Sequence, residues 1–195
     1  MHTMERYFVL EDTMEITDKI AQDVMKNVMK YAKILKKDPE NYEARAEIMW
    51  CGSLSHNGLT GCGTCGGDWA THLIEHELGG MFDVAHGAGL AAVWGSWARY
   101  VMDEKPERFA QFAVDVMGVE ESDDVKSTAL KGIEAVEEFY RMIEMPTNMK
   151  ELGINPTDEQ IKDMAMKATN HDTQQLGAFK KLSAKDLVEI YKTAK

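Results

Sequence analysis

The chain has 195 residues, 44% of them hydrophobic and 28% charged, a length and balance typical of one sizeable globular domain. Its formal net charge of −11 argues against nucleic-acid and anionic-membrane partners, because both carry negative charge themselves. Charged residues interrupt every long apolar stretch, so neither a signal peptide nor a membrane-spanning segment is expected, and the predicted location is cytoplasmic.

Apolar residues recur at helical spacing along nearly the whole chain, and we find no run with the alternation typical of strands. The first seven residues, MHTMERY, resemble the middle of a helix without a cap. The other predicted helices cover, in chain order, residues 17–35, 41–59, 69–78, 86–102, 106–117, 125–145, a segment that begins at 157, and 183–193. The sequence therefore predicts an all-α domain.

Glycine and capping residues predict where several of these helices begin and end. Residues 58–67, GLTGCGTCGG, are expected to form a loop because so many glycines do not sustain a helix. Gly79 and Gly80 are expected to end the helix that begins near Trp69. Thr157 and Gln160 have the spacing of a capping box.

The three cysteines do not indicate a disulfide framework, because their number is odd in a chain of this length. Cys62 and Cys65 have C-x-x-C spacing, which fits a redox pair or half of a zinc site. The first would need a strand–turn–helix setting and the second another ligand pair, and neither is visible. Cys51, Cys62 and Cys65 are therefore predicted to be free thiols.

Three of the six histidines lie in the stretch THLIEHELGGMFDVAHG, residues 71–87. His72 and His76 are four residues apart and share one helix face, where two imidazoles are able to bind one metal. His86 follows after the glycine pair, at the start of a new helix, and Gly87 permits close approach of a backbone or a ligand. This arrangement predicts a metal site.

One alternative for the same residues is an H-x-x-E-H metallopeptidase. His72 and His76 would then be zinc ligands and Glu75 the general base. A third, acidic ligand would have to come from a later helix, for example from Glu134, Glu137 or Glu138. This hypothesis leaves His86 without a role.

The histidine spacing resembles the H-x3-H-x9-H-G pattern of the iron-containing alcohol dehydrogenases, at His72, His76, His86 and Gly87. The stretches PENYEARAEIMW, HNGLTG and DWATHLIEHEL (39–50, 56–61 and 68–78) are similar to the butanol dehydrogenase and NADPH-dependent aldehyde reductase branch of that family. The first residues, HTMERY, and the tail, with NHD at 170–172 and DLVEIYKTA at 186–194, fit as well. The resemblance covers residues 1–195 and implies a multi-helix orthogonal bundle, like the C-terminal domain of dehydroquinate synthase.

Carried over to this chain, the resemblance implies that His2, His72 and His86 bind one divalent metal, Fe²⁺ or Zn²⁺. The family's fourth ligand, an aspartate one turn before the first histidine, would precede Met1. His76 is implied to lie near the nicotinamide and the substrate, with a role in proton handling. Glu75 is then expected to be a carboxylate on the helix surface.

The implied activity is the NAD(P)-dependent interconversion of primary alcohols and aldehydes, by an enzyme that the resemblance suggests is a homodimer. The loop at 58–67 lacks G-x-G-x-x-G spacing and no strand precedes it, so no cofactor-binding residue is assigned. The family's nucleotide-binding half is expected to lie outside these 195 residues, and the chain alone is expected to be inactive. The alternative from another class is a stand-alone helical metal-binding module without enzymatic activity.

Overall fold

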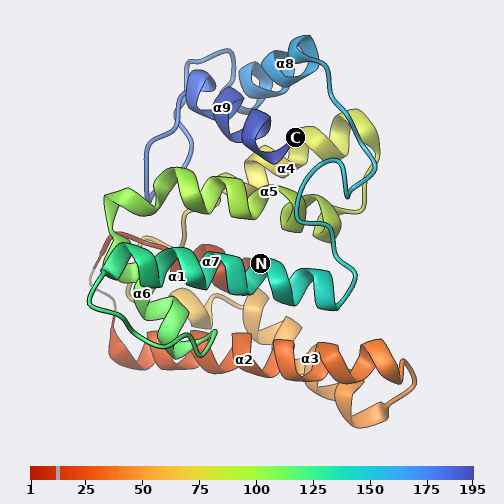
Figure 1. Ribbon diagram of the computed structural model, residues 1–195, viewed down its shortest axis with the longest axis vertical. Coiled ribbons are helices and arrows are strands. Elements are labelled where there is room, and N and C mark those ends of the chain that lie inside the picture. The colour runs from red at the N-terminus through yellow and green to blue at the C-terminus, as the bar shows by residue number, and fades with distance from the viewer. Residues whose placement is uncertain (12–13) are drawn as a thin grey trace.

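The computed structural model describes residues 1–11 and 14–195, and these residues form helices joined by loops (Figure 1). The helices are α1 (His2–Tyr7), α2 (Glu15–Lys37), α3 (Tyr42–His56), α4 (Ala70–Phe82), α5 (His86–Val101), α6 (Pro106–Asp115), α7 (Val125–Met142), α8 (Asp158–Ala168) and α9 (Ala184–Ala194), with 3₁₀ turns η1 (Leu59–Gly61) and η2 (Met102–Glu104). Within the described ranges, β pairing is limited to an isolated bridge between Leu176 and Leu182. The predicted all-α class is confirmed.

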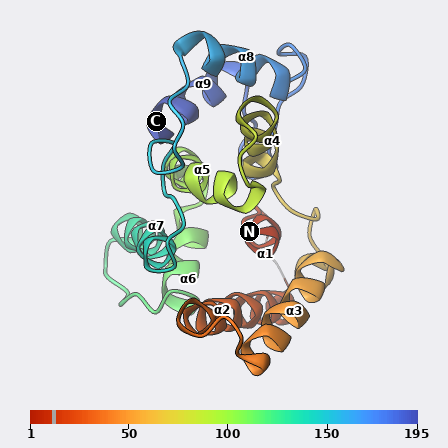
Figure 2. The same ribbon diagram turned by 90° about the vertical axis from the view of Figure 1, so that its right-hand side faces the viewer.

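The short helix α1 lies near the middle of the molecule, between α5 and the pair formed by α2 and α3 (Figure 2). Helices α4, α8 and α9 gather at one end, and α2 and α3 pack against each other at the opposite end. The N-termini of α1, α4 and α5 belong to different parts of the sequence but approach one another at the centre. The fold thus brings three helix starts together.

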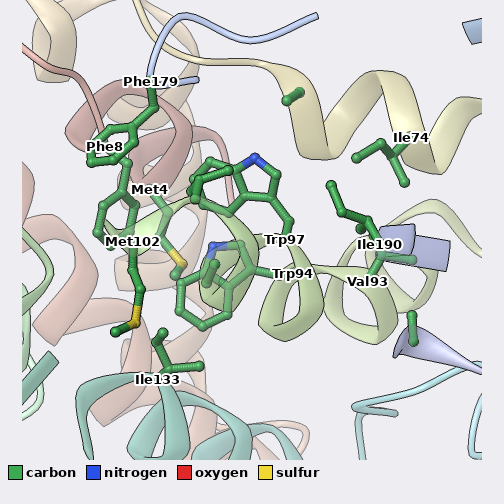
Figure 3. Packing of buried hydrophobic residues seen from close by; sticks show 14 of the residues in the cluster. Met4, Phe8, Ile74, Val93, Trp94, Trp97, Met102, Ile133, Phe179 and Ile190 are labelled. Carbon is green, nitrogen blue, oxygen red and sulfur yellow. The ribbon is translucent and has the colours of Figure 1, made fainter. Parts of the chain in front are cut away.

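The core is built around α5, which is apolar on nearly every face and buried along most of its length. Figure 3 shows Trp94 and Trp97 of α5 beside Phe8, which follows α1 directly. The Phe8 ring stacks on the ring of Phe109 with their centroids 4.4 Å apart. The two tryptophans, whose aromatic rings suit a ligand pocket as well as a core, are core residues here. This packing holds α1 and α5 in fixed positions.

Two predicted boundaries near α4 and α2 differ from the structure. Helix α4 continues through Gly79 and Gly80 and ends at Phe82, so the prediction of a break at the glycine pair was wrong. Glycine costs only about 1 kcal/mol in a helix, and tertiary packing offsets that cost. Helix α2 begins at Glu15 rather than at 17, so Thr17 lies inside the helix, where its hydroxyl donates to the Cys62 carbonyl at 2.9 Å.

Other local expectations agree with the structure. The segment MHTMERY is helical from His2, and Thr157 and Gln160 form the predicted capping box of α8. Two further helix ends differ from the prediction, because α3 and α7 both end three residues before the expected position. Cys62 and Cys65 are exposed free thiols in the glycine-rich loop. In the part of the chain that is described, no helix has the length and apolar character needed to cross a bilayer.

Candidate metal centre

The side chain of Glu5 connects α1 to the start of α4. Its Oε2 accepts the backbone N–H of Trp69 at 2.8 Å, and its Oε1 accepts that of His72 at 3.1 Å. The Glu5 carbonyl also accepts the N–H of Asp68 at 2.9 Å. Trp69 precedes α4 with a positive φ of 63° and gives the helix no side-chain cap, so Glu5 provides the capping carboxylate from another helix. His72 therefore faces α1.

The ring of His72 is oriented by the same carboxylate. His72 Nδ1 donates to Glu5 Oε1 at 3.0 Å, because a carboxylate oxygen only accepts, and this leaves Nε2 without a proton in the neutral ring. Nε2 is buried and has no hydrogen-bond partner among the described residues. A buried polar nitrogen without a partner is costly unless a ligand satisfies it. A metal ion would do so, since neutral imidazole nitrogen is a common ligand.

The structure brings His2, His72 and His86 together from the first turns of α1, α4 and α5. The centroid of the His72 ring lies 4.5 Å from that of His2 and 5.3 Å from that of His86. Burial, followed by the neighbouring His72 and His56, lowers the pKa of His2 to about 4. The His2 ring is therefore neutral near pH 7, the form in which imidazole binds metals.

Glu75 is buried rather than on the helix surface, so the expectation for this residue was wrong. The residue is 1% exposed, and its carboxylate accepts a hydrogen bond from Nδ1 of His86 through Oε2. Its other oxygen, Oε1, is buried without a hydrogen-bond partner in the described structure. The helical spacing of residues 72–78 did not predict this burial, because α5 covers this face of α4 only in the folded chain.

His76 lies at the exposed edge of the cluster. Its ring centroid is 5.6 Å from that of His86 and 6.3 Å from that of His72. Among the described residues, Glu75, His76 and His86 are the group whose possible ligand atoms all lie within 4.8 Å of one another. Within this group, Oε2 of Glu75 and Nδ1 of His86 are already hydrogen-bonded to each other. The unpartnered Nε2 of His72 instead favours the set with His2, His72 and His86.

His56 is a neighbour of the cluster to which the sequence pattern assigned no role. It lies at the end of α3, and its ring centroid is 4.1 Å from that of His2. Its Nδ1 lies 2.8 Å from the carbonyl oxygen of Gly52 in its own helix. The centroid of the Trp69 ring lies 5.8 Å from that of His2. The HNGLTG stretch contained His56, but no local spacing relates it to the other histidines.

The metallopeptidase arrangement finds no support in these contacts. Glu75, its expected general base, is hydrogen-bonded to His86. Glu137, one of the acidic residues considered as a third ligand, accepts two hydrogen bonds from the guanidinium of Arg99, at 2.5 and 2.9 Å. Each carboxylate therefore has a hydrogen-bond partner that the metallopeptidase arrangement does not include.

Comparison with known proteins shows the family to which the chain belongs. A family model described as "Fe-containing alcohol dehydrogenase family, C-terminal" matches residues 1–195. NADH-dependent butanol dehydrogenase A of Clostridium acetobutylicum is 31% identical over 192 residues, which cover 98% of this chain and 49% of that protein. The NADPH-dependent aldehyde reductase YqhD of Escherichia coli is 30% identical, with 100% of this chain and 49% of that protein covered.

A solved structure shares the fold as well. The crystal structure of NADH-dependent butanol dehydrogenase A from Thermotoga maritima matches with a TM-score of 0.90 and 34% identity, over 99% of this chain and 49% of that one. The chain thus spans about half the length of the relatives it matches.

Proposed function

Since the chain belongs to the Fe-containing alcohol dehydrogenase family, we propose that it is the metal-binding helical domain of an NAD(P)-dependent enzyme that interconverts primary alcohols and aldehydes. The observation that carries this proposal is the meeting of His2, His72 and His86, with a buried and unpartnered His72 Nε2 among the described residues. The substrate class is taken from the butanol dehydrogenases and the aldehyde reductase that the chain resembles.

The donor set fits a divalent metal. Imidazole nitrogens with carboxylates nearby suit either Fe²⁺ or Zn²⁺, and the site offers three rings, so a position remains for substrate. When bound, the ion supplies Lewis acidity that stabilises negative charge on the substrate oxygen. His2, His72 and His86 would hold the ion, and Glu5 keeps the His72 lone pair on Nε2 facing it.

His76 is the residue that we assign to proton handling. It is exposed beside His86, and its ring has no hydrogen-bond partner within the described structure. Its imidazole would accept the hydroxyl proton of the alcohol, or return a proton to the oxygen of the aldehyde. The indole of Trp69, packed against His2 and His72, limits water access on one side of the rings.

A metal titration tests the ligand set. We expect the wild-type chain to bind one Zn²⁺ or Co²⁺ in isothermal titration calorimetry. Substitution of His2, His72 or His86 by Ala should weaken binding by more than the roughly 10- to 100-fold that outer partners contribute. His76→Ala should have a much smaller effect on affinity. His171→Asn is the matched control, because asparagine tolerates the positive φ of 57° at this distant residue.

Failure to bind an ion would reject the proposal. A loss of affinity caused by His76→Ala as large as that caused by His72→Ala would instead favour a site at Glu75, His76 and His86.

An activity assay tests whether the helical domain needs a separate nucleotide-binding half. The described residues contain no strand followed by a glycine-rich turn and a helix, the arrangement that binds a dinucleotide pyrophosphate. We expect the 195-residue chain with metal to show no oxidation of NADH or NADPH by butanal. Activity should appear when the chain is fused to the nucleotide-binding half of a butanol dehydrogenase. Turnover by the chain alone would overturn this assignment.

A further inference from the structure

We propose that Glu75 is a positioning residue for His86, and that Gly89 is needed to make room for the Glu75 carboxylate. This inference rests on the proposed metal site. It gives a role to Glu75 and Gly89, which are not metal ligands in the proposed site.

His86 needs an external constraint because its own surroundings do not fix it. It is the first residue of α5, and its side chain is 47% exposed. An exposed imidazole is free to change its rotamer, and either nitrogen is able to carry the proton. The hydrogen bond from Nδ1 to Glu75 Oε2 selects one rotamer and one tautomer. Nε2 is then the nitrogen that keeps a lone pair.

The Glu75 carboxylate contacts His86 and is shielded from solvent. Its side chain is 2% exposed, although burying a carboxylate is costly unless hydrogen bonds or opposite charge compensate it. His86 is the hydrogen-bond partner that the described structure gives it, and Oε1 has none. A cation beyond the far nitrogen of His86 would supply the missing compensation, because the ring transmits charge between its two nitrogens.

Gly89 lies three residues after His86, on the face of α5 that covers Glu75. A Cβ at this position would lie 2.6 Å from Glu75 Oε1, 2.8 Å from Cγ and 3.1 Å from Cδ. The first two distances are too short for non-bonded atoms, so a side chain at 89 would displace the carboxylate. Gly79 borders the same oxygen from α4, with its Cβ position 3.3 Å from Oε1. Glycines on both helices therefore enclose the Glu75 carboxylate.

The pair Glu5–His72 repeats the arrangement of Glu75–His86. In both pairs a buried carboxylate accepts a hydrogen bond from Nδ1 and leaves Nε2 as the ligand nitrogen. Glu5 also caps α4, so its substitution would mix an effect on the metal with an effect on folding. Glu75 has no backbone hydrogen bond through its carboxylate in the described structure, which makes it the cleaner position to test.

Two variants and two matched controls separate positioning from general effects. Glu75→Gln removes the charge and keeps the size. Gly89→Ala moves the carboxylate without changing any polar group. Glu77→Gln removes one charge from the same helix at a partly exposed site. Gly80→Ala adds a methyl group that meets nothing within 4 Å beyond the local helix backbone. Thermal unfolding of each variant checks that it is folded.

We expect Glu75→Gln and Gly89→Ala each to weaken Zn²⁺ and Co²⁺ binding by about 10- to 100-fold, the range typical of outer partners of metal ligands. Both controls should stay within about twofold of the wild type, as expected for substitutions that leave the ligand and its partner in place. In the metal-free chain, ¹⁵N NMR of the histidine rings should show His86 protonated on Nδ1 in the wild type and a mixture of tautomers in Glu75→Gln.

Normal metal binding by both variants, with tight binding by the wild type, would overturn the positioning role and leave the metal site intact. A wild-type His86 protonated on Nε2 would overturn it as well, even where a variant does not fold. No metal binding by the wild type would reject the proposed function and this inference together.

Discussion

Asp68 is a buried carboxylate that joins the loop before α4 to the loop before α9. Its Oδ1 accepts the N–H of Ala70 at 3.0 Å, and its Oδ2 accepts those of Ala178 and Phe179, both at 2.7 Å. Gly177 permits this approach, because a Cβ there would lie 3.0 Å from Oδ2. Burial raises the pKa of Asp68 to about 6, and the three hydrogen bonds only partly oppose that shift.

This pKa predicts how stability depends on pH. Between its usual value of 3.8 and about 6, the folded chain binds a proton at Asp68 that the unfolded chain has released. The contribution of Asp68 to the free energy of unfolding therefore falls as pH rises from about 4 to 6, by on the order of 2–3 kcal/mol, and is constant above that window.

Urea unfolding at several pH values measures this effect as the stability difference between the wild type and Asp68→Asn. As pH rises from about 4 to 6, the wild type should lose stability relative to Asp68→Asn. A difference that does not change with pH would show that Asp68 has an ordinary pKa.

At the scale of the helices, boundaries were predicted less well than the helices themselves. Periodicity identified each long helix because burial of one face repeats every three to four residues. The predicted end of α4 was wrong because glycine only slightly disfavours a helix. Packing of neighbouring residues such as Leu78 in the core stabilises the helix in spite of the two glycines. Contacts between helices, unlike helix periods, have no local signature.

The contact between α6 and α7 gives a prediction at this scale. A Cβ at Gly132 would lie 2.5 Å from the Cβ of Ala113 and 3.0 Å from its Cα. Gly132→Ala should therefore force the two helices apart and lower the free energy of unfolding by about 1–3 kcal/mol, as overpacking does.

Gly52→Ala in α3 is the matched control, because no described atom lies within 4 Å of its Cβ position. It should leave stability unchanged or raise it by up to about 1 kcal/mol through helix propensity. Equal effects of the two substitutions in chemical denaturation would argue against close packing at Gly132.

At the scale of the whole molecule, Arg108 of α6 joins three segments at the centre. Its guanidinium donates to both carboxylate oxygens of Asp18 in α2, at 2.6 and 2.7 Å. It also donates twice to the carbonyl of Tyr7 in α1, at 2.7 and 2.9 Å, and stacks 3.7 Å from the centroid of the Tyr7 ring. The position of α1, and with it that of His2 and Glu5, depends on this buried pair.

Arg108→Met should destabilise the fold by about 3–5 kcal/mol, because it leaves a buried carboxylate without its main cation. Lys126→Met, which breaks the exposed pair of Lys126 with Asp103, should cost much less, because water and salt screen an exposed ion pair. The free energies of unfolding from urea titrations compare the two variants. A loss for Arg108→Met no larger than for Lys126→Met would contradict a central structural role for the buried pair.

Residue spacing by itself determined the all-α class, the capping box at Thr157 and the placement of His72 and His76 on one helix face, because these are properties of a helical period of 3.6 residues. The residue pattern also placed His86 in a predicted metal site, and the family resemblance added His2 and implied His2, His72 and His86 as the ligands. Their role as ligands stays a prediction, although the structure brings the rings of His2 and His86 beside His72.

Only the tertiary structure decided which groups support those rings. Glu5 reaches His72 because α1 docks at the start of α4, Glu75 is buried because Gly89 lets α5 approach it, and His56 meets His2 because α3 ends beside α1. Each of these contacts joins different helices. A periodic pattern describes one helix at a time, whereas burial and hydrogen bonding between helices depend on how the whole chain packs.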